Sequence, residues 1–145
     1  MIREAEQRDL FDLLTLYTHL HEKSVPEDSA ALQTLWAQIL ADPHYHLIVA
    51  EEDGRVVSTC TCLIVPNLTH VQRPYALIEN VVTDPAYRGR GLATGCLAFA
   101  REIAVQQNCY KLMLMTGSQE ESTLRFYERA GYDKKGKTAF VLWQE

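Results

Sequence analysis

The sequence has no apolar run near the ~20 residues that a membrane-spanning helix requires, and it has no excess of positive charge. Its 14 Lys and Arg against 19 Asp and Glu give a net charge of −5. The chain as a whole therefore does not attract phosphate backbones or anionic membranes. The charged N-terminus MIREAEQRDL contains no signal-peptide core. We expect a cytoplasmic protein that binds neither nucleic acid nor membranes.

Cysteine, proline and glycine are also scarce, with four, five and seven residues among 145. Four cysteines in a chain that is large enough to form its own core fit buried thiols in a reducing compartment, not a disulfide framework. A hydrophobic fraction of 47% and a charged fraction of 23% are typical of a soluble folded chain. The length and composition exclude disordered, collagenous and multidomain proteins, and they predict one domain over residues 1–145.

Helical spacing of apolar residues and runs of β-branched residues divide the chain into alternating elements. The expected strands cover residues 2–5, 45–51, 55–65, 75–83, 111–116 and 138–143. The expected helices cover residues 10–20, 32–40, 91–107 and 122–130. Asp53-Gly54 predicts a tight antiparallel hairpin, and the strand, helix, strand order over 75–116 predicts a parallel pair. These features indicate an α/β (mixed α+β) fold.

The most informative segment follows the expected strand over 75–83. There a turn with two glycines and two arginines, residues 88–91, opens directly into a helix. Glycine allows positive φ and close approach of a ligand, and the free N–H groups of a helix N-terminus bind anions. The third glycine of the dinucleotide fingerprint and the lysine of the P-loop are missing. The turn therefore suits the pyrophosphate of another cofactor, although a tight turn alone also requires glycines.

The motif Arg88-Gly89-Arg90-Gly91-Leu92-Ala93 resembles the Arg/Gln-x-x-Gly-x-Gly/Ala signature of the GNAT acetyltransferase superfamily. The similarity extends over nearly the whole chain, in the order that the family shows. The other matching segments are Ile2-Arg3-x-Ala5 before Asp9, the Asp53-Gly54 turn, Asn80-Val81-Val82, Asp84-Pro85, and Phe126-Tyr127-Glu128-Arg129-x-Gly131-Tyr132. Order and spacing together make this match specific.

The resemblance implies acetyl-CoA as the cosubstrate, a primary amine as the acceptor and direct transfer in a ternary complex. It also implies a mostly antiparallel mixed sheet with helices on both faces and a parallel pair of strands splayed to bind acetyl-CoA. Backbone N–H groups from Arg90 to Thr94 would hold the pyrophosphate, and the strand at Val81 and Val82 would bind the pantetheine arm. The residues so assigned to acetyl-CoA are Val81, Val82, Arg88, Gly89, Arg90, Gly91, Leu92, Ala93 and Thr94.

Acetyl transfer to an amine requires a base for the ammonium proton and benefits from an acid at the leaving thiolate. Tyr127 occupies the Phe-Tyr-Glu position where family members carry the general acid; its alternative role is packing. Glu79 is an acidic residue within an otherwise apolar strand, where burial would make it a better base. Several family members have an acid there, notably those resembling glucosamine 6-phosphate N-acetyltransferases. We expect Tyr127 and Glu79 to be catalytic, with a solvated strand face as the alternative for Glu79.

Two further features concern the acceptor and the cofactor arm. Arg73 and His70, in the polar loop before the strand over 75–83, are candidates to bind an anionic group of the acceptor, or are simply solvated. The asparagine that many relatives carry six or seven residues before the helix tyrosine is absent, since the chain reads Ser118-Gln119-Glu120-Glu121-Ser122. Gln119 and Ser122 are the candidate replacements.

The pairs His44-x-His46 and Cys60-x-Cys62 could suggest a zinc site on the hairpin. A two-residue turn at Asp53-Gly54 would pair residues whose numbers sum to 107, which places Cys60 opposite Leu47. The cysteines would then lie on one face and the histidines on the other. This register argues against a metal site.

Two classes of function remain open. The first is an N-acetyltransferase for a small amine, with protein N-termini or lysines as the alternative acceptor. The second is a non-catalytic acyl-CoA-binding sensor. The pair Glu79 and Tyr127 favours the enzyme, whereas the missing asparagine favours the sensor. A homodimer is expected from the resemblance and from the frequency of two-fold assemblies.

Overall fold

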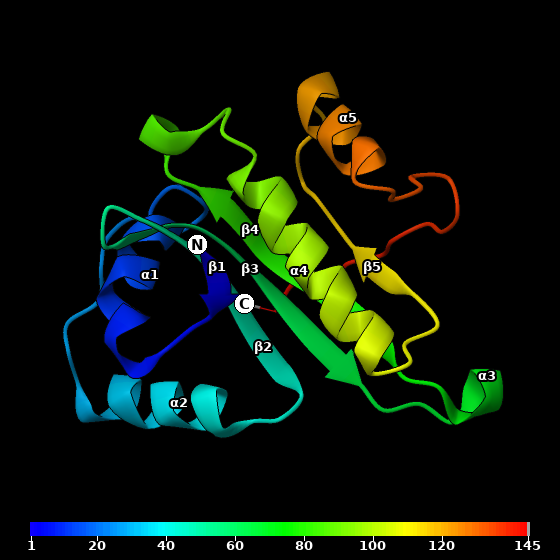
Figure 1. Cartoon of the computed structure of the whole chain (residues 1–145), viewed down its shortest axis with the longest axis horizontal. Helices are drawn as coiled ribbons and strands as arrows, with labels where there is room; N and C mark the ends of the chain where they lie inside the picture. Colours follow the sequence, from blue (N-terminus) through cyan, green and yellow to red (C-terminus); the bar gives the residue numbers. More distant parts are fainter. Residues whose placement is uncertain (145) are drawn as a thin grey trace.

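The computed structural model describes residues 1–144, which form one five-stranded sheet in the order β1-β2-β3-β4-β5 (Figure 1). The strands are β1 (Ile2–Glu4), β2 (Tyr45–Glu52), β3 (Arg55–Val65), β4 (Tyr75–Thr83) and β5 (Leu112–Leu114). The helices are α1 (Leu10–Tyr17), α2 (Ala30–Ala41), α3 (Thr69–Gln72), α4 (Leu92–Gln106) and α5 (Glu121–Arg129), with 3-10 turns at Gln7–Asp9 and Pro85–Tyr87. Each neighbouring pair from β1–β2 through β3–β4 is antiparallel, whereas β4 and β5 are parallel. The expected mixed fold with one parallel pair is confirmed.

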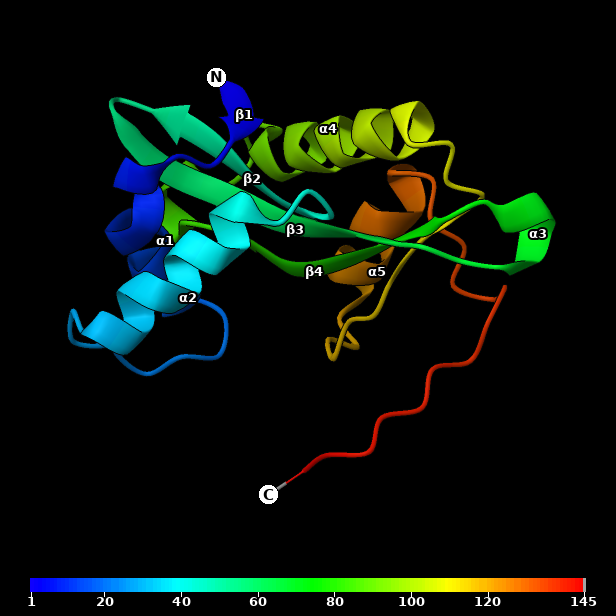
Figure 2. The ribbon, with the colours of Figure 1, turned by 90° about the horizontal axis from the view of Figure 1, so that it is seen from below.

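Helices cover both faces of the sheet (Figure 2). On one face, Ile48, Cys60 and Ile78 pack with Cys96 and Ala100 of α4, and α5 adds partly buried aromatic residues. On the other face of the sheet, α1 and α2 pack against strand residues that point to the opposite side. This second cluster contains Leu13 and Leu16 of α1, Trp36 of α2, Leu47 and Val49 of β2, and Val82 of β4. Because successive side chains of a strand point to opposite faces, the central strands are apolar on both sides. Within residues 1–144, no helix has the length and apolarity needed to cross a bilayer.

The register of the β2–β3 hairpin differs from the expectation by one residue. Next to the turn Glu52 pairs with Arg55, as predicted, but a β-bulge between Ala50 and Glu51 shifts all pairs beyond it. Cys62 therefore lies opposite His46, so the predicted separation of cysteines and histidines onto different faces is wrong. The described residues contain no group of three or more potential metal ligands, and the His46 Nδ1 is 2.8 Å from a Glu4 carboxylate oxygen.

The expected strand over residues 138–143 is also not formed. Residues 137–144 belong to no helix or strand and are exposed. In Figure 2 this segment runs away from the sheet as an extended chain. The prediction of a sixth strand was wrong for a single copy of the chain, because a strand needs a partner edge and this segment reaches none.

A network of ion pairs around Arg3 joins β1 to the start of α1 and to β2. The Arg3 guanidinium lies 2.7 Å from Asp9 and 2.6 Å from Glu51, and Asp9 also accepts a 2.7 Å hydrogen bond from the Glu6 amide. Burial alone would raise the pKa of Asp9, but the hydrogen bonds from Arg3 and Glu6 outweigh it and hold this pKa below its usual range. Asp9 thus stabilises the folded state in its charged form.

We predict that Asp9→Asn lowers the free energy of unfolding by about 2–3 kcal/mol, because it leaves Arg3 without one of its charged partners. A depressed folded pKa contributes stability above the unfolded pKa, and this contribution is lost as the pH falls through the folded value. Urea unfolding should therefore show wild-type stability decreasing below about pH 4 more steeply than that of Asp9→Asn. Asp53→Asn, at the hairpin turn, serves as the control with a small effect at every pH. Parallel pH dependences for wild type and Asp9→Asn would contradict the assignment.

Candidate active site

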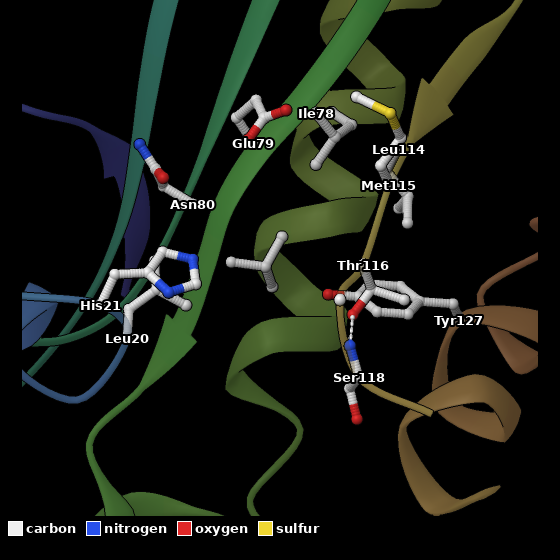
Figure 3. A pocket seen from close by; sticks show the side chains of 12 residues that line it. Leu20, His21, Ile78, Glu79, Asn80, Leu114, Met115, Thr116, Ser118 and Tyr127 are labelled. Carbon is white, nitrogen blue, oxygen red and sulfur yellow. Dashed lines mark hydrogen bonds between the residues drawn. The ribbon is translucent and has the colours of Figure 1, made fainter. Parts of the chain in front are cut away.

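The candidate site lies where β4 and β5 separate. The two strands pair over only three residues each, from Ala76–Leu112 to Ile78–Leu114, and then diverge. Beyond the Ile78–Leu114 pair, a cavity of about 240 Å³ lies between the two strands (Figure 3). Its lining residues are Leu20, His21, Ile78, Glu79, Asn80, Val81, Leu114, Met115, Thr116, Gly117, Ser118 and Tyr127.

A β-bulge in β4 contributes to this separation. Thr61 pairs with Glu79 and Thr59 pairs with Val82, so two residues of β4, Asn80 and Val81, lie opposite Cys60 alone. Asn80 has φ of 51°, a conformation that asparagine tolerates better than most residues. A bulge bends its strand and interrupts the hydrogen-bonded ladder. The backbone of β4 beside the cavity is therefore available to a ligand.

Glu79 stands immediately before this bulge and lines the cavity. Figure 3 shows its side chain on one side of the cavity and Tyr127 on another, with His21 next to Asn80. The Glu79 side chain is exposed, which agrees with the solvated strand face given above as the alternative to burial. The bulge opens the strand to solvent at this point, which the apolar character of the surrounding sequence did not indicate.

Tyr127 comes from the second turn of α5 and is partly buried. Its ring contacts Phe126 at a centroid distance of 5.0 Å and Tyr132 at 6.4 Å. Burial raises the pKa of the Tyr127 phenol above its ordinary value. The phenol consequently keeps its proton at neutral pH and can donate a hydrogen bond into the cavity.

The glycine turn has the conformation that the sequence predicted. Gly89 and Gly91 have φ of 77° and 75°, and no atom lies within 4 Å of where a side chain would begin at either residue. Gly91 precedes α4 without a side-chain cap, so the first N–H groups of the helix lack acceptors within it. The turn is thus an open cradle of N–H donors at the end of the sheet where β4 and β5 separate (Figure 1).

The two arginines of this turn differ in their surroundings. The Arg90 Nη1 donates a 3.0 Å hydrogen bond to Glu52, and its guanidinium lies 4.8 Å from the Tyr87 ring centre. Both arginines are exposed, but only Arg90 has these contacts, which link the turn to the hairpin. The sequence assigned two valines to the pantetheine arm of acetyl-CoA. Val81 lines the cavity, whereas Val82 is buried in the cluster that α1 covers.

Arg73 and His70 are not brought to this cavity. They lie before the start of β4, at the end of the strand remote from the glycine turn (Figure 1). The His70 ring stacks on Tyr110 at 3.7 Å, and Arg73 donates hydrogen bonds to the carbonyls of Asn108 and Cys109 at 3.1 Å each. These contacts attach the loop to the chain before β5.

Sequence reasoning missed several lining residues. The first helix ends at Tyr17, not Leu20, and the turn after it carries Leu20 and His21 to the cavity. The sequence had suggested that Leu20 is the last residue of the apolar, helically spaced series that begins at Leu10. Ser118 lines the cavity, whereas Gln119 and Ser122, the candidate replacements for the missing asparagine, do not. The Ser118 amide donates a 3.2 Å hydrogen bond to the Thr116 hydroxyl, which shapes this wall.

Comparison with known proteins agrees with this arrangement. Residues 9–132 match the acetyltransferase (GNAT) family. The chain belongs to this family, and it is an acetyltransferase. It is 33% identical over 135 residues to a glucosamine 6-phosphate N-acetyltransferase of Trypanosoma brucei brucei, covering 90% of this chain and 87% of that protein.

Two solved structures show the same GNAT fold. A protein of Agrobacterium tumefaciens, named as a candidate acetyltransferase, is 44% identical with a TM-score of 0.91, over 99% of both chains. An aminoglycoside N-acetyltransferase solved in complex with CoA has a TM-score of 0.78 over 99% of both chains. The second is 16% identical and is therefore similar in fold alone.

We predict that Gly91→Val weakens acetyl-CoA binding at least about tenfold, because a β-branched residue is strongly disfavoured at positive φ and its side chain would occupy the cradle. Titration calorimetry measures the affinity. Gly54→Val is the matched control, since Gly54 has φ of 73° and equally open surroundings at the hairpin tip. Unchanged affinity in a folded Gly91→Val protein would exclude this turn as the pyrophosphate site.

We predict that Tyr127→Phe lowers turnover by ~10² while acetyl-CoA affinity stays nearly constant, because only the hydroxyl is removed. Tyr132→Phe is the matched control, since this neighbouring tyrosine is similarly buried but does not line the cavity. Its turnover should stay within about threefold of wild type. Equal effects of the two substitutions would show that Tyr127 acts only in packing.

Proposed function

We propose that this protein transfers the acetyl group of acetyl-CoA directly to a primary amine of a small molecule. The glycine turn over residues 88–91 would hold the pyrophosphate, and the interrupted β4 backbone at Val81 would bind the pantetheine arm. The thioester would then lie in the cavity between β4 and β5. The observation that carries this proposal is that Glu79 and Tyr127, from two different elements, line the same cavity.

The two side chains have complementary tasks in this reaction. Glu79, directly or through a water, accepts a proton from the ammonium, and the free amine attacks the thioester carbon. The new C–N bond forms as the carbonyl becomes an oxyanion, and collapse of this intermediate breaks the C–S bond. The nitrogen loses its second proton to solvent water, and the departing thiolate can take up a proton from the same solvent. Tyr127 donates its hydroxyl hydrogen towards the leaving sulfur. Both side chains would then lie beside the reacting atoms before the reaction begins.

The raised pKa of Tyr127 determines how far its proton moves. A thiol has a pKa near 8.5 and an unperturbed phenol one near 10, so a thiolate is the weaker base. Burial raises the pKa of Tyr127 further, which makes complete transfer to sulfur less favourable. Tyr127 therefore acts mainly by hydrogen bonding to the charge that develops on sulfur as the C–S bond breaks.

A small acceptor is favoured by the name of the Trypanosoma relative, an enzyme for an amino sugar phosphate. Residues 1–145 would act as one N-acetyltransferase domain without a metal. A cytoplasmic location agrees with four cysteines that are all free thiols. A homodimer completes the proposal.

The function is tested by measuring free thiol released from acetyl-CoA across a panel of amino sugars, amino acid derivatives, peptides and aminoglycosides. Release that depends on one small amine, with the acetylated amine identified by mass spectrometry, is the expected result. Transfer to peptides alone would move the activity to protein substrates. Tight acetyl-CoA binding without release for any amine would indicate an acyl-CoA sensor.

We predict that Glu79→Gln loses most of its turnover near neutral pH but recovers at high pH, where the acceptor deprotonates in bulk solvent without help. The measurement is the pH–rate profile with the best acceptor from the panel. Glu102→Gln, an exposed position on α4, is the control and should follow the wild-type profile. If Glu79→Gln also follows it, the base is a water or another residue.

A further inference from the structure

Thr61 of β3 places a buried hydroxyl on a largely apolar face of the sheet. It is 4% exposed, and its Oγ1 has no hydrogen-bond partner among the described residues. Its chain neighbours Cys60 and Cys62 pack under α4, so Thr61 points to the opposite face, which α1 and α2 cover (Figure 2). A buried hydroxyl without a partner is costly, and valine would fill nearly the same volume without this cost. A threonine here is explained if its hydroxyl acts on a neighbouring group.

The neighbour of Thr61 on β4 is Glu79. The two residues pair directly across the antiparallel strands, so their side chains leave the same face of the sheet. Cβ atoms of such pairs lie about 4.5–5.5 Å apart, which brings a hydroxyl and a carboxylate within reach of a hydrogen bond, made directly or by way of one water. The residue opposite Thr61 on β2 is Leu47, which has no polar side chain. Because a carboxylate only accepts hydrogen bonds, Thr61 is the donor of this pair.

A third oxygen-bearing side chain reaches Thr61 from α1. Tyr17 is the last residue of this helix and packs, partly buried, in the same cluster as Leu47. Burial raises the pKa of the Tyr17 phenol, and the adjacent Thr61 hydroxyl acts in the opposite direction. The two hydroxyls are close but do not have hydrogen-bond geometry in this arrangement. The phenol keeps its proton at neutral pH and can donate it in a hydrogen bond to Thr61 once the threonine hydroxyl turns towards Glu79.

Orientation is important for Glu79 because its side chain is exposed. An exposed glutamate samples several rotamers, whereas a base must lie within hydrogen-bond reach of the proton that it accepts. We propose that Thr61, supported by Tyr17, donates a hydrogen bond that holds the Glu79 carboxylate in the position for proton transfer. This inference rests on the proposed function of Glu79 as the base. Thr61 is a positioning residue, since it does not line the cavity itself.

Thr61→Val tests the proposal because it removes the hydroxyl with little change in volume. With the best acceptor from the panel, we expect kcat to fall about tenfold, while KM for the acceptor and the affinity for acetyl-CoA stay nearly constant. Thermal stability should stay the same or increase, because an unpartnered buried hydroxyl is removed. Thr61→Ser, which restores the hydroxyl, should recover most of the rate. A higher acceptor KM at constant kcat would show that Thr61 binds the acceptor instead, and would overturn the proposal.

Thr59→Val is the matched control on the same strand. Thr59 is fully buried, pairs with Val82 of β4, and donates a 2.6 Å hydrogen bond to the Ile48 carbonyl. Loss of this bond should lower the stability and leave kcat within about twofold of wild type. Equal losses of kcat in Thr59→Val and Thr61→Val would indicate a general effect on the sheet and would contradict a specific role of Thr61.

A double-mutant cycle with Glu79→Gln separates this inference from the proposed function. If Thr61 acts through Glu79, Thr61→Val should change kcat by less than about twofold in the Glu79→Gln protein near neutral pH. Additive losses would show that Thr61 acts independently, which would overturn the positioning role and leave Glu79 as the base. A Glu79→Gln protein with the wild-type rate would reject the base itself, and the inference would fall with it.

Discussion

The site depends on the early separation of β4 and β5. Three residue pairs hold these parallel strands together, and the bulge at Asn80 then bends β4 away from its neighbours. Backbone groups that a continuous sheet would use for pairing are left for another partner, and buried backbone groups rarely remain without one. The same separation makes space for Tyr127 to enter from α5. The cavity, the free backbone and the position of Tyr127 are therefore consequences of one geometric feature.

The glycine turn is placed by the same end of the sheet. In a strand, helix, strand unit the helix begins where the first strand ends, so the N-terminus of α4 lies beside the opening between β4 and β5. The positive φ of Gly89 and Gly91 defines the conformation of this turn, and an exposed ion pair links Arg90 to Glu52 on the β2–β3 hairpin. Binding then requires less ordering of the chain than a mobile loop would.

Sequence reasoning identified the elements with strong periodicity and the signature at residues 88–93, but not the two bulges. The central strands explain this failure. Ile48, Val49 and Ala50 are all buried, as are Thr59, Cys60 and Thr61, so no alternation of polar and apolar residues fixes which face each one takes. A single extra residue then changes the register without changing the pattern. The misplaced cysteines follow from this, and so does the fact that the sequence left the exposure of Glu79 undecided.

Two walls of the cavity, one at Leu20 and His21 and one from Leu114 to Ser118, depend on different contacts. Leu20 and His21 reach it from the end of α1, whose start is tied to β1 and β2 by Arg3 and Asp9. These ion pairs anchor the start of the helix that leads to that wall. The opposite wall, from Leu114 to Ser118, continues from a strand of only three residues at the edge of the sheet. Short edge strands are the least protected part of a sheet, so this wall depends on the three residue pairs that join β5 to β4.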